Sequence, residues 1–150
     1  MNALTRIRQW VLALLVFGLI GTIVELLLLE HYEAGWQLVP LWLIALALGV
    51  VIWHLLRPHA GSVRALHVLM WLFVFGGAVG VGLHFDGAAE FQIELDPSQS
   101  RWEIFKKAMH AKAPPVLAPG MMMQLGLLGL TYVYRHPALS ASEPAPGERE

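Results

Sequence analysis

The sequence predicts an all-α membrane protein, with four transmembrane helices in an antiparallel bundle and one amphipathic helix on the extracytoplasmic surface. Three observations lead to this fold class. Apolar residues make up 57 % of the 150 residues. Charged residues make up only 14 %, whereas ordinary soluble domains contain about 25 %. The apolar residues also gather in runs that are long enough to cross a bilayer as helices.

The four apolar runs are the expected membrane spans, at about residues 10–29, 38–56, 64–83 and 116–134. The first run carries Glu25 and is longer than the apolar core of a secretory signal, which has about 7–15 residues. The last run is the weakest, because Pro119 and Gly120 interrupt it. We expect residues 1–136 to form a single membrane domain and residues 137–150, rich in Pro, Ser, Ala and Glu, to be a disordered tail.

Small residues repeat at helical spacing in three of the runs. Such pairs allow membrane helices to approach each other closely. The expected contacts between helices therefore pass through three pairs of glycines: Gly18 and Gly21, Gly76 and Gly80, and Gly126 and Gly129.

The longest polar segment lies between the third and fourth runs. Alternating residues at 91–95 predict a short extended piece, and an amphipathic helix is expected at about 97–112. Ser100 and Glu103 form a capping box at the start of this helix. Its apolar stripe, which we expect to lie on the membrane surface or over the mouth of the bundle, comprises Trp102, Phe105 and Met109.

The positions of Lys and Arg near the spans predict the orientation. One side holds Arg6, Arg8, Arg57, Arg64 and Arg135. The other side has no basic residue in its first loop, and its long loop holds Arg101, Lys106, Lys107 and Lys112. By the positive-inside rule, both termini are expected to be cytoplasmic and the long loop extracytoplasmic.

The ends of the first and third spans carry acids and histidines that the topology places on the same side. The candidate metal ligands are Glu25, His31, His84, Asp86 and Glu90, with Glu30 and Glu33 nearby. Imidazole and carboxylate suit zinc, copper(II), iron or manganese, and the absence of cysteine excludes thiolate sites. The alternative is a solvated acidic loop in which His84 forms a structural hydrogen bond. Glu25, inside an apolar span, is either a proton- or metal-binding group or a buried hydrogen-bonding group.

A second candidate site lies at the opposite ends of the second and third spans. His54 and His67 are expected at similar depth on neighbouring antiparallel helices, as two axial ligands of a b-type haem would be. Both lie near helix ends, where interfacial histidines are common. Haem binding is therefore an alternative to the metal site.

No catalytic or nucleotide-binding motif is found in the sequence, and the net charge of −1 gives no basic face for nucleic acid. The favoured function is a non-catalytic accessory or binding subunit whose acid–histidine mouth holds a divalent transition metal ion or a proton. One alternative is an electron carrier with haem b. Another is a membrane enzyme that uses the outer carboxylates and His84 on a lipid or quinone. The expected partners are the lipid bilayer and further copies or subunits of a membrane complex.

Overall fold

The computed structural model of the chain describes residues 2–33, 35–111 and 114–140. These residues form helices and turns with no strand among them, which confirms the all-α prediction. The elements are α1 (Ala3–Leu28), the short 3-10 helix η1 (Gly35–Gln37), α2 (Leu38–Leu56), α3 (Ala60–Leu95), α4 (Arg101–Met109), α5 (Leu117–Val133) and α6 (Pro137–Ser140). Within the described ranges, three segments are long and apolar enough to cross a membrane, namely α1, η1 with α2, and α3. The apolar helix α5 is shorter, at 17 residues.

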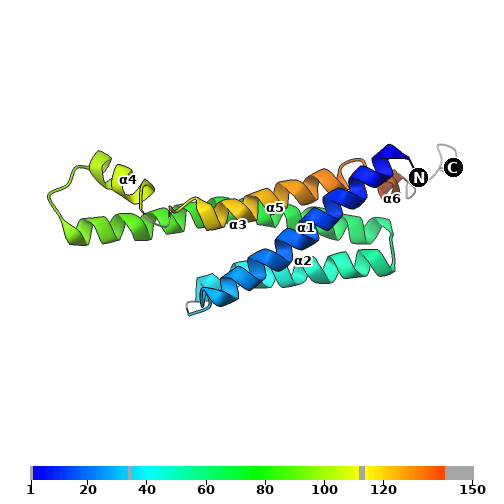
Figure 1. Cartoon of the computed structure of the whole chain (residues 1–150), viewed down its shortest axis with the longest axis horizontal. Helices are drawn as coiled ribbons and strands as arrows, with labels where there is room; N and C mark the ends of the chain where they lie inside the picture. Colours follow the sequence, from blue (N-terminus) through cyan, green and yellow to red (C-terminus); the bar gives the residue numbers. More distant parts are fainter. Residues whose placement is uncertain (1, 34, 112–113, 141–150) are drawn as a thin grey trace, which may run out of the picture.

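The long helices lie along the long axis of the molecule and define two ends (Figure 1). The start of α1, the connection from α2 to α3 and the end of α5 lie at the right of Figure 1. We call this the arginine end, because five arginines of the sequence lie in these segments or within a few residues of them: Arg6, Arg8, Arg57, Arg64 and Arg135. The connection from α1 to α2 and the start of α5 lie toward the other end, which we call the histidine end after His31 and His84.

A core of apolar side chains holds α1, α2, α3 and α5 together. Its fully buried members include Leu15, Leu19, Ile44, Leu66, Met70 and Phe73. Many other large apolar side chains of these helices point away from the core and are exposed, including Leu14, Phe17, Trp42 and Phe75. An apolar exterior of this kind is suited to lipid and not to water.

The closest contact between two helices is made by α3 and α5, and glycine permits it. A Cβ atom on Gly77 would lie 2.6 Å from the carbonyl oxygen of Pro119. On Gly126 it would lie 2.7 Å from the carbonyl oxygen of Met70. Of the glycine contacts expected from the sequence, those through Gly126 and Gly129 are confirmed. Gly77 is a contact that the pattern of pairs missed.

The other predicted glycine pairs give a mixed result. A Cβ atom on Gly18 would clash with the Leu125 side chain, and a Cβ atom on Gly80 would lie 3.0 Å from the Pro119 side chain. A Cβ atom on Gly76 would be in ordinary contact with Leu43, at 3.6 Å. The prediction for Gly21 is wrong, because no atom lies within 4 Å of the corresponding position.

Helix α3 is longer than predicted, and the expected extended piece at residues 91–95 is wrong. The helix has 36 residues, or about 54 Å at the usual rise, against a bilayer core of about 30 Å. It ends where Asp96 becomes extended (φ −154°, ψ 97°) before Pro97, because a residue before proline avoids helical geometry. Phe91, Ile93 and Leu95 are all exposed, so their alternation with polar residues does not mark a buried face.

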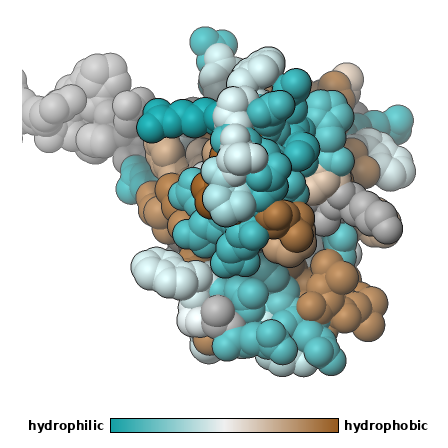
Figure 2. All heavy atoms as spheres, turned by 90° about the vertical axis from the view of Figure 1, so that its left-hand side faces the viewer, coloured by the Kyte–Doolittle hydropathy of each residue, from teal (hydrophilic) through white to brown (hydrophobic). Residues whose placement is uncertain are grey.

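The last part of α3 projects beyond α1 and α2, and α4 folds back onto it (Figure 1). The predicted capping box of α4 is confirmed, since Ser100 and Glu103 each bond the other's backbone N–H. Phe105 packs against Phe85 of α3, with ring centroids 5.7 Å apart. Figure 2, viewed from this side, shows a largely hydrophilic face, to which Asp86, Glu90, Glu94, Arg101, Lys106 and Lys107 contribute exposed side chains.

Helix boundaries at the arginine end also differ from expectation. α3 begins at Ala60 and not near residue 64, because the His59 side chain accepts a hydrogen bond from the Ser62 backbone N–H and caps the helix. Residues 137–140, expected to belong to the disordered tail, form α6, and Ala138 and Leu139 pack against the core. The remainder of the predicted tail, residues 141–150, lies outside the described residues.

Candidate functional site

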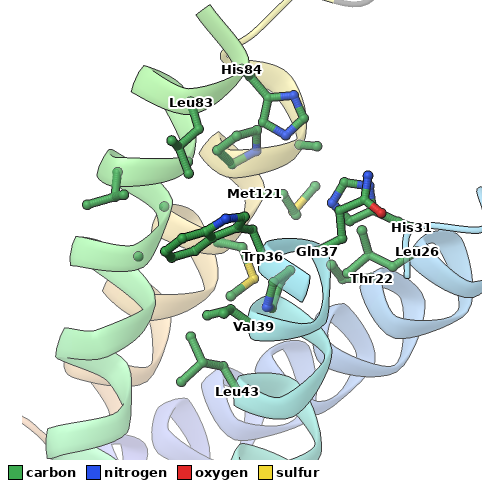
Figure 3. Close-up of a pocket in the computed structure, with 18 of the residues that line it drawn as sticks. Thr22, Leu26, His31, Trp36, Gln37, Val39, Leu43, Leu83, His84 and Met121 are labelled. Carbon is green, nitrogen blue, oxygen red and sulfur yellow. The ribbon is translucent and has the colours of Figure 1, made fainter. Parts of the chain in front are cut away.

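A cavity of about 610 Å³ lies at the histidine end between α1, α2, α3 and the start of α5 (Figure 3). We call it the His31–His84 cavity. Most of its wall is apolar, including Leu26, Val39, Leu43, Val79, Leu83 and Met121. Its volume is within the range of about 300–1,000 Å³ that is typical of small-molecule sites.

A turn at the end of α1 positions His31. Glu30 has a left-handed backbone (φ 52°), and the N–H of His31 donates to the carbonyl of Leu26 at 2.9 Å. This is the hydrogen bond of a Schellman turn, which ends a helix and fixes the direction of the next residue. His31 is thereby held at the rim of the cavity (Figure 3).

His84 reaches the same rim from α3. Gly76, Gly77 and Gly80 precede it on one face of the helix and also line the cavity. These glycines let Leu43 and Pro119 approach α3 closely below the imidazole, because Cβ atoms on Gly76, Gly77 and Gly80 would meet those two residues. The rings of His31 and His84 are nearly parallel, with an angle of 12° between their planes and centroids 6.1 Å apart.

The surroundings of His31 disfavour its protonated form. Burial lowers the pKa of His31, and a charge on His84 would lower it further. A neutral imidazole has one nitrogen that donates a hydrogen bond and one that accepts. His31 therefore favours its neutral form, which offers one donor and one acceptor at the rim of the cavity.

Glu25 lines the cavity from α1, one helical turn after Thr22, which also lines it. Of the five predicted metal ligands, the structure brings Glu25, His31 and His84 to this one cavity. Asp86 and Glu90 are exposed and do not line it. Within the described parts of the chain, no three His, Asp or Glu side chains lie close enough together to hold a metal ion. Metal binding therefore stays a prediction.

Two cavity residues that were not predicted from the sequence come from η1. Trp36 and Gln37 precede α2 and line the cavity, and the indole of Trp36 points toward α3 (Figure 3). Trp36 is 79 % exposed, so its ring forms part of the opening and not of the core. The sequence does contain an indication of this residue, namely a tryptophan that follows a polar loop. The same pattern is typical of an anchor at the membrane interface.

Val79 and Leu83 line the cavity and are also exposed. They belong to the apolar part of α3. The cavity wall therefore includes side chains from the apolar, exposed part of α3.

The second candidate site, at the arginine end, is a hydrogen-bonded network. His54 is 4 % exposed; its Nδ1 lies 2.8 Å from the Ser62 hydroxyl and its Nε2 lies 2.7 Å from the Tyr132 hydroxyl. The Ser62 hydroxyl donates to the carbonyl of His59 at 2.9 Å, so it accepts from Nδ1–H of His54. Nε2 must then accept from the Tyr132 hydroxyl.

This network leaves no ring nitrogen of His54 for a haem iron. His67 is exposed, and its Nε2 accepts a hydrogen bond from Trp71 of the same helix at 3.1 Å. The geometry gives the haem alternative no support, and the network instead joins three helices. Ser62 and Tyr132 were not identified from the sequence, because neither has a distinctive spacing from His54.

No protein-family model, curated protein or solved structure matches this chain. The apolar helices and apolar exterior indicate a small integral membrane protein. The cavity alone provides a basis for a more specific function.

Proposed function

We propose that this chain is a non-catalytic membrane protein, acting alone or as an accessory subunit, that binds a small amphipathic molecule in the His31–His84 cavity. The observation that carries the proposal is the composition of the cavity wall. Apolar side chains surround a volume of about 610 Å³, and Glu25, His31 and His84 lie on it at the histidine end. Such a wall suits a ligand with an apolar body and one polar group.

The proposed topology places this cavity in the outer half of the membrane. α1, α2, α5 and the first part of α3 would be the four spans, with α5 compensating for its shorter length by tilt or local thinning of the bilayer. The arginine end would face the cytoplasm. The hydrophilic projection made by the end of α3 and α4 would then lie outside.

An amphipathic ligand fits the cavity better than a metal ion does. Two imidazoles and one carboxylate line it, but no described set of three ligands converges. Structural zinc takes four ligands. Elemental analysis of the purified protein tests the metal prediction independently, and a stoichiometric metal that is lost in His84→Ala would favour it.

Two glycines of α3 offer a matched test of ligand binding. Gly87 lines the cavity and Gly82 does not, and no atom lies within 4 Å of a Cβ at either position. Gly87→Leu should therefore fill the cavity, whereas Gly82→Leu should add an exposed side chain on the same helix.

The measurement is native mass spectrometry of protein released from nanodiscs that were formed directly from the expressing membrane. We expect a bound molecule of constant mass in the unmodified chain and in Gly82→Leu, with reduced occupancy in Gly87→Leu. If the spectra of all three proteins are the same, the cavity does not bind the ligand and the proposal fails.

A further inference from the structure

We infer that the His31–His84 cavity selects an amphipathic cation, an apolar molecule with one amine or quaternary ammonium group, and that Glu25 is its counter-ion. This inference rests on the proposed function and names the class of ligand. Two observations support the inference: the charged side chains on the cavity wall and the position of one aromatic ring.

The fixed charge on the cavity wall is negative. Among the described residues that line the cavity, Glu25 is the only Asp or Glu, and none is Lys or Arg. Within the described segments, no residue forms an ion pair with the Glu25 carboxylate. A carboxylate in an apolar span is costly unless it has a partner, and a bound cation would provide one.

The histidines are compatible with this selection. Burial of His31 and the proximity of His84 disfavour a positive charge on His31. A neutral His31 imidazole does not repel a cation, and it carries a nitrogen that can accept a hydrogen bond from a protonated amine.

Trp36 adds a second type of interaction with a cation. Its indole is largely exposed, lines the cavity and points toward α3 (Figure 3). Tryptophan is the aromatic residue that attracts cations most strongly through its ring face. An amine or quaternary ammonium group in the cavity would therefore be attracted by this ring as well as by the carboxylate, because both residues line the same cavity.

The same wall disfavours the other classes of amphipathic ligand. A fatty carboxylate or a lipid phosphate would place a second negative charge near Glu25, with no described Lys or Arg on the wall to compensate it. An uncharged ligand would enter the cavity but would leave Glu25 without a counter-ion.

Three photoreactive probes with identical dodecyl chains distinguish these classes. Each carries a diazirine on the chain, and the head group is trimethylammonium, hydroxyl or carboxylate. The protein is labelled in nanodiscs, and cross-links to cavity segments are quantified by mass spectrometry relative to cross-links elsewhere on α1. We expect the cationic probe to label the cavity roughly tenfold more than the alcohol, which corresponds to about 1.4 kcal/mol.

Glu25→Gln should abolish this preference, and Glu25→Asp should retain part of it. The matched control is Glu90→Gln, because Glu90 is exposed on α3 and does not line the cavity. If Glu25→Gln does not fold, competition on the unmodified chain by unlabelled dodecyltrimethylammonium against dodecanol decides the question.

The outcomes separate this inference from the proposed function. Equal cavity labelling by all three probes, reduced in each case by Gly87→Leu, would overturn cation selection and leave the binding function intact. Cavity labelling no higher than the general labelling of α1 would overturn both.

Discussion

The Nε2 atom of His54 and the hydroxyl oxygen of Tyr132 lie 2.7 Å apart, and their hydrogen bond joins α2 to α5 inside the bundle. The other ring nitrogen of His54 bonds Ser62 at the start of α3. One buried imidazole therefore fixes three helices relative to one another at the arginine end. Because both nitrogens have partners, the polar group can be buried without a large cost.

Tyr132→Phe should destabilise the protein, because it leaves Nε2 of His54 buried without a donor. The expected loss is about 1–3 kcal/mol. Thermal unfolding in mild detergent, followed by the fluorescence of the six tryptophans, measures it. Tyr134→Phe is the control, since Tyr134 is 66 % exposed at the end of α5. Equal melting temperatures for the two variants would mean that this hydrogen bond does not stabilise the fold.

Gly77→Ala should separate α3 from α5. The added methyl group would lie 2.6 Å from the Pro119 carbonyl oxygen and 3.0 Å from the Met123 backbone nitrogen, and backbone atoms cannot move aside as a flexible side chain can. Overpacking of this kind costs about 1–3 kcal/mol. Gly82→Ala on the same helix, with no atom within 4 Å, should be neutral or stabilise by up to about 1 kcal/mol. If Gly77→Ala has the same melting temperature as Gly82→Ala, α3 and α5 are not in close contact at this position.

The long apolar runs made the main helices predictable, because length and composition alone identify a candidate span. The boundaries of α3 were not predictable in the same way. Its start depends on His59, an uncommon capping residue, and its end depends on Pro97 and not on the last apolar residue of the span. Five alternating residues at 91–95 suggested a strand, but a short alternation carries little information without a buried face.

The candidate site was predicted only in part, also because the end of α3 was misplaced. His31, His84 and Glu25 were expected on one side of the membrane, and all three line one cavity. Asp86 and Glu90 were added on the assumption that the helix ended near residue 83. Because α3 continues, successive residues turn by 100°, so Asp86 lies about 200° around the helix from His84. The cavity itself depends on the packing of four helices and on Trp36, and no local pattern indicates it.

The stability of the protein should fall as the pH is lowered from 7.5 to 5.5. Burial lowers the pKa of both His31 and His136 below the ordinary value of 6.5. The unfolded chain therefore binds protons more readily than the folded chain in this range, and stability is lost as the pH falls. Asp96 and Glu103 also have lowered pKa values, through hydrogen bonds with Ser98 and Ser100, but their contribution is lost only near pH 4 and below.

Melting temperatures at pH 7.5 and 5.5 measure this dependence. His31→Gln should reduce the difference between them, because glutamine does not titrate. His110→Gln is the control, since His110 is exposed at the end of α4. A pH dependence that is the same in both variants would show that His31 does not contribute to it.

Occupancy of the His31–His84 cavity is tested most directly by the reactivity of a single thiol. The sequence has no cysteine, so Gly87→Cys and Gly82→Cys each introduce one reporter on α3, inside and outside the cavity wall respectively. The rate of modification by a maleimide is measured in nanodiscs with and without dodecyltrimethylammonium, and then with dodecanol. We expect either amphiphile to slow the reaction several-fold at position 87 and to leave position 82 unchanged, with the cation acting at lower concentration. Equal rates with and without amphiphile at position 87, or equal slowing at both positions, would contradict ligand binding in this cavity.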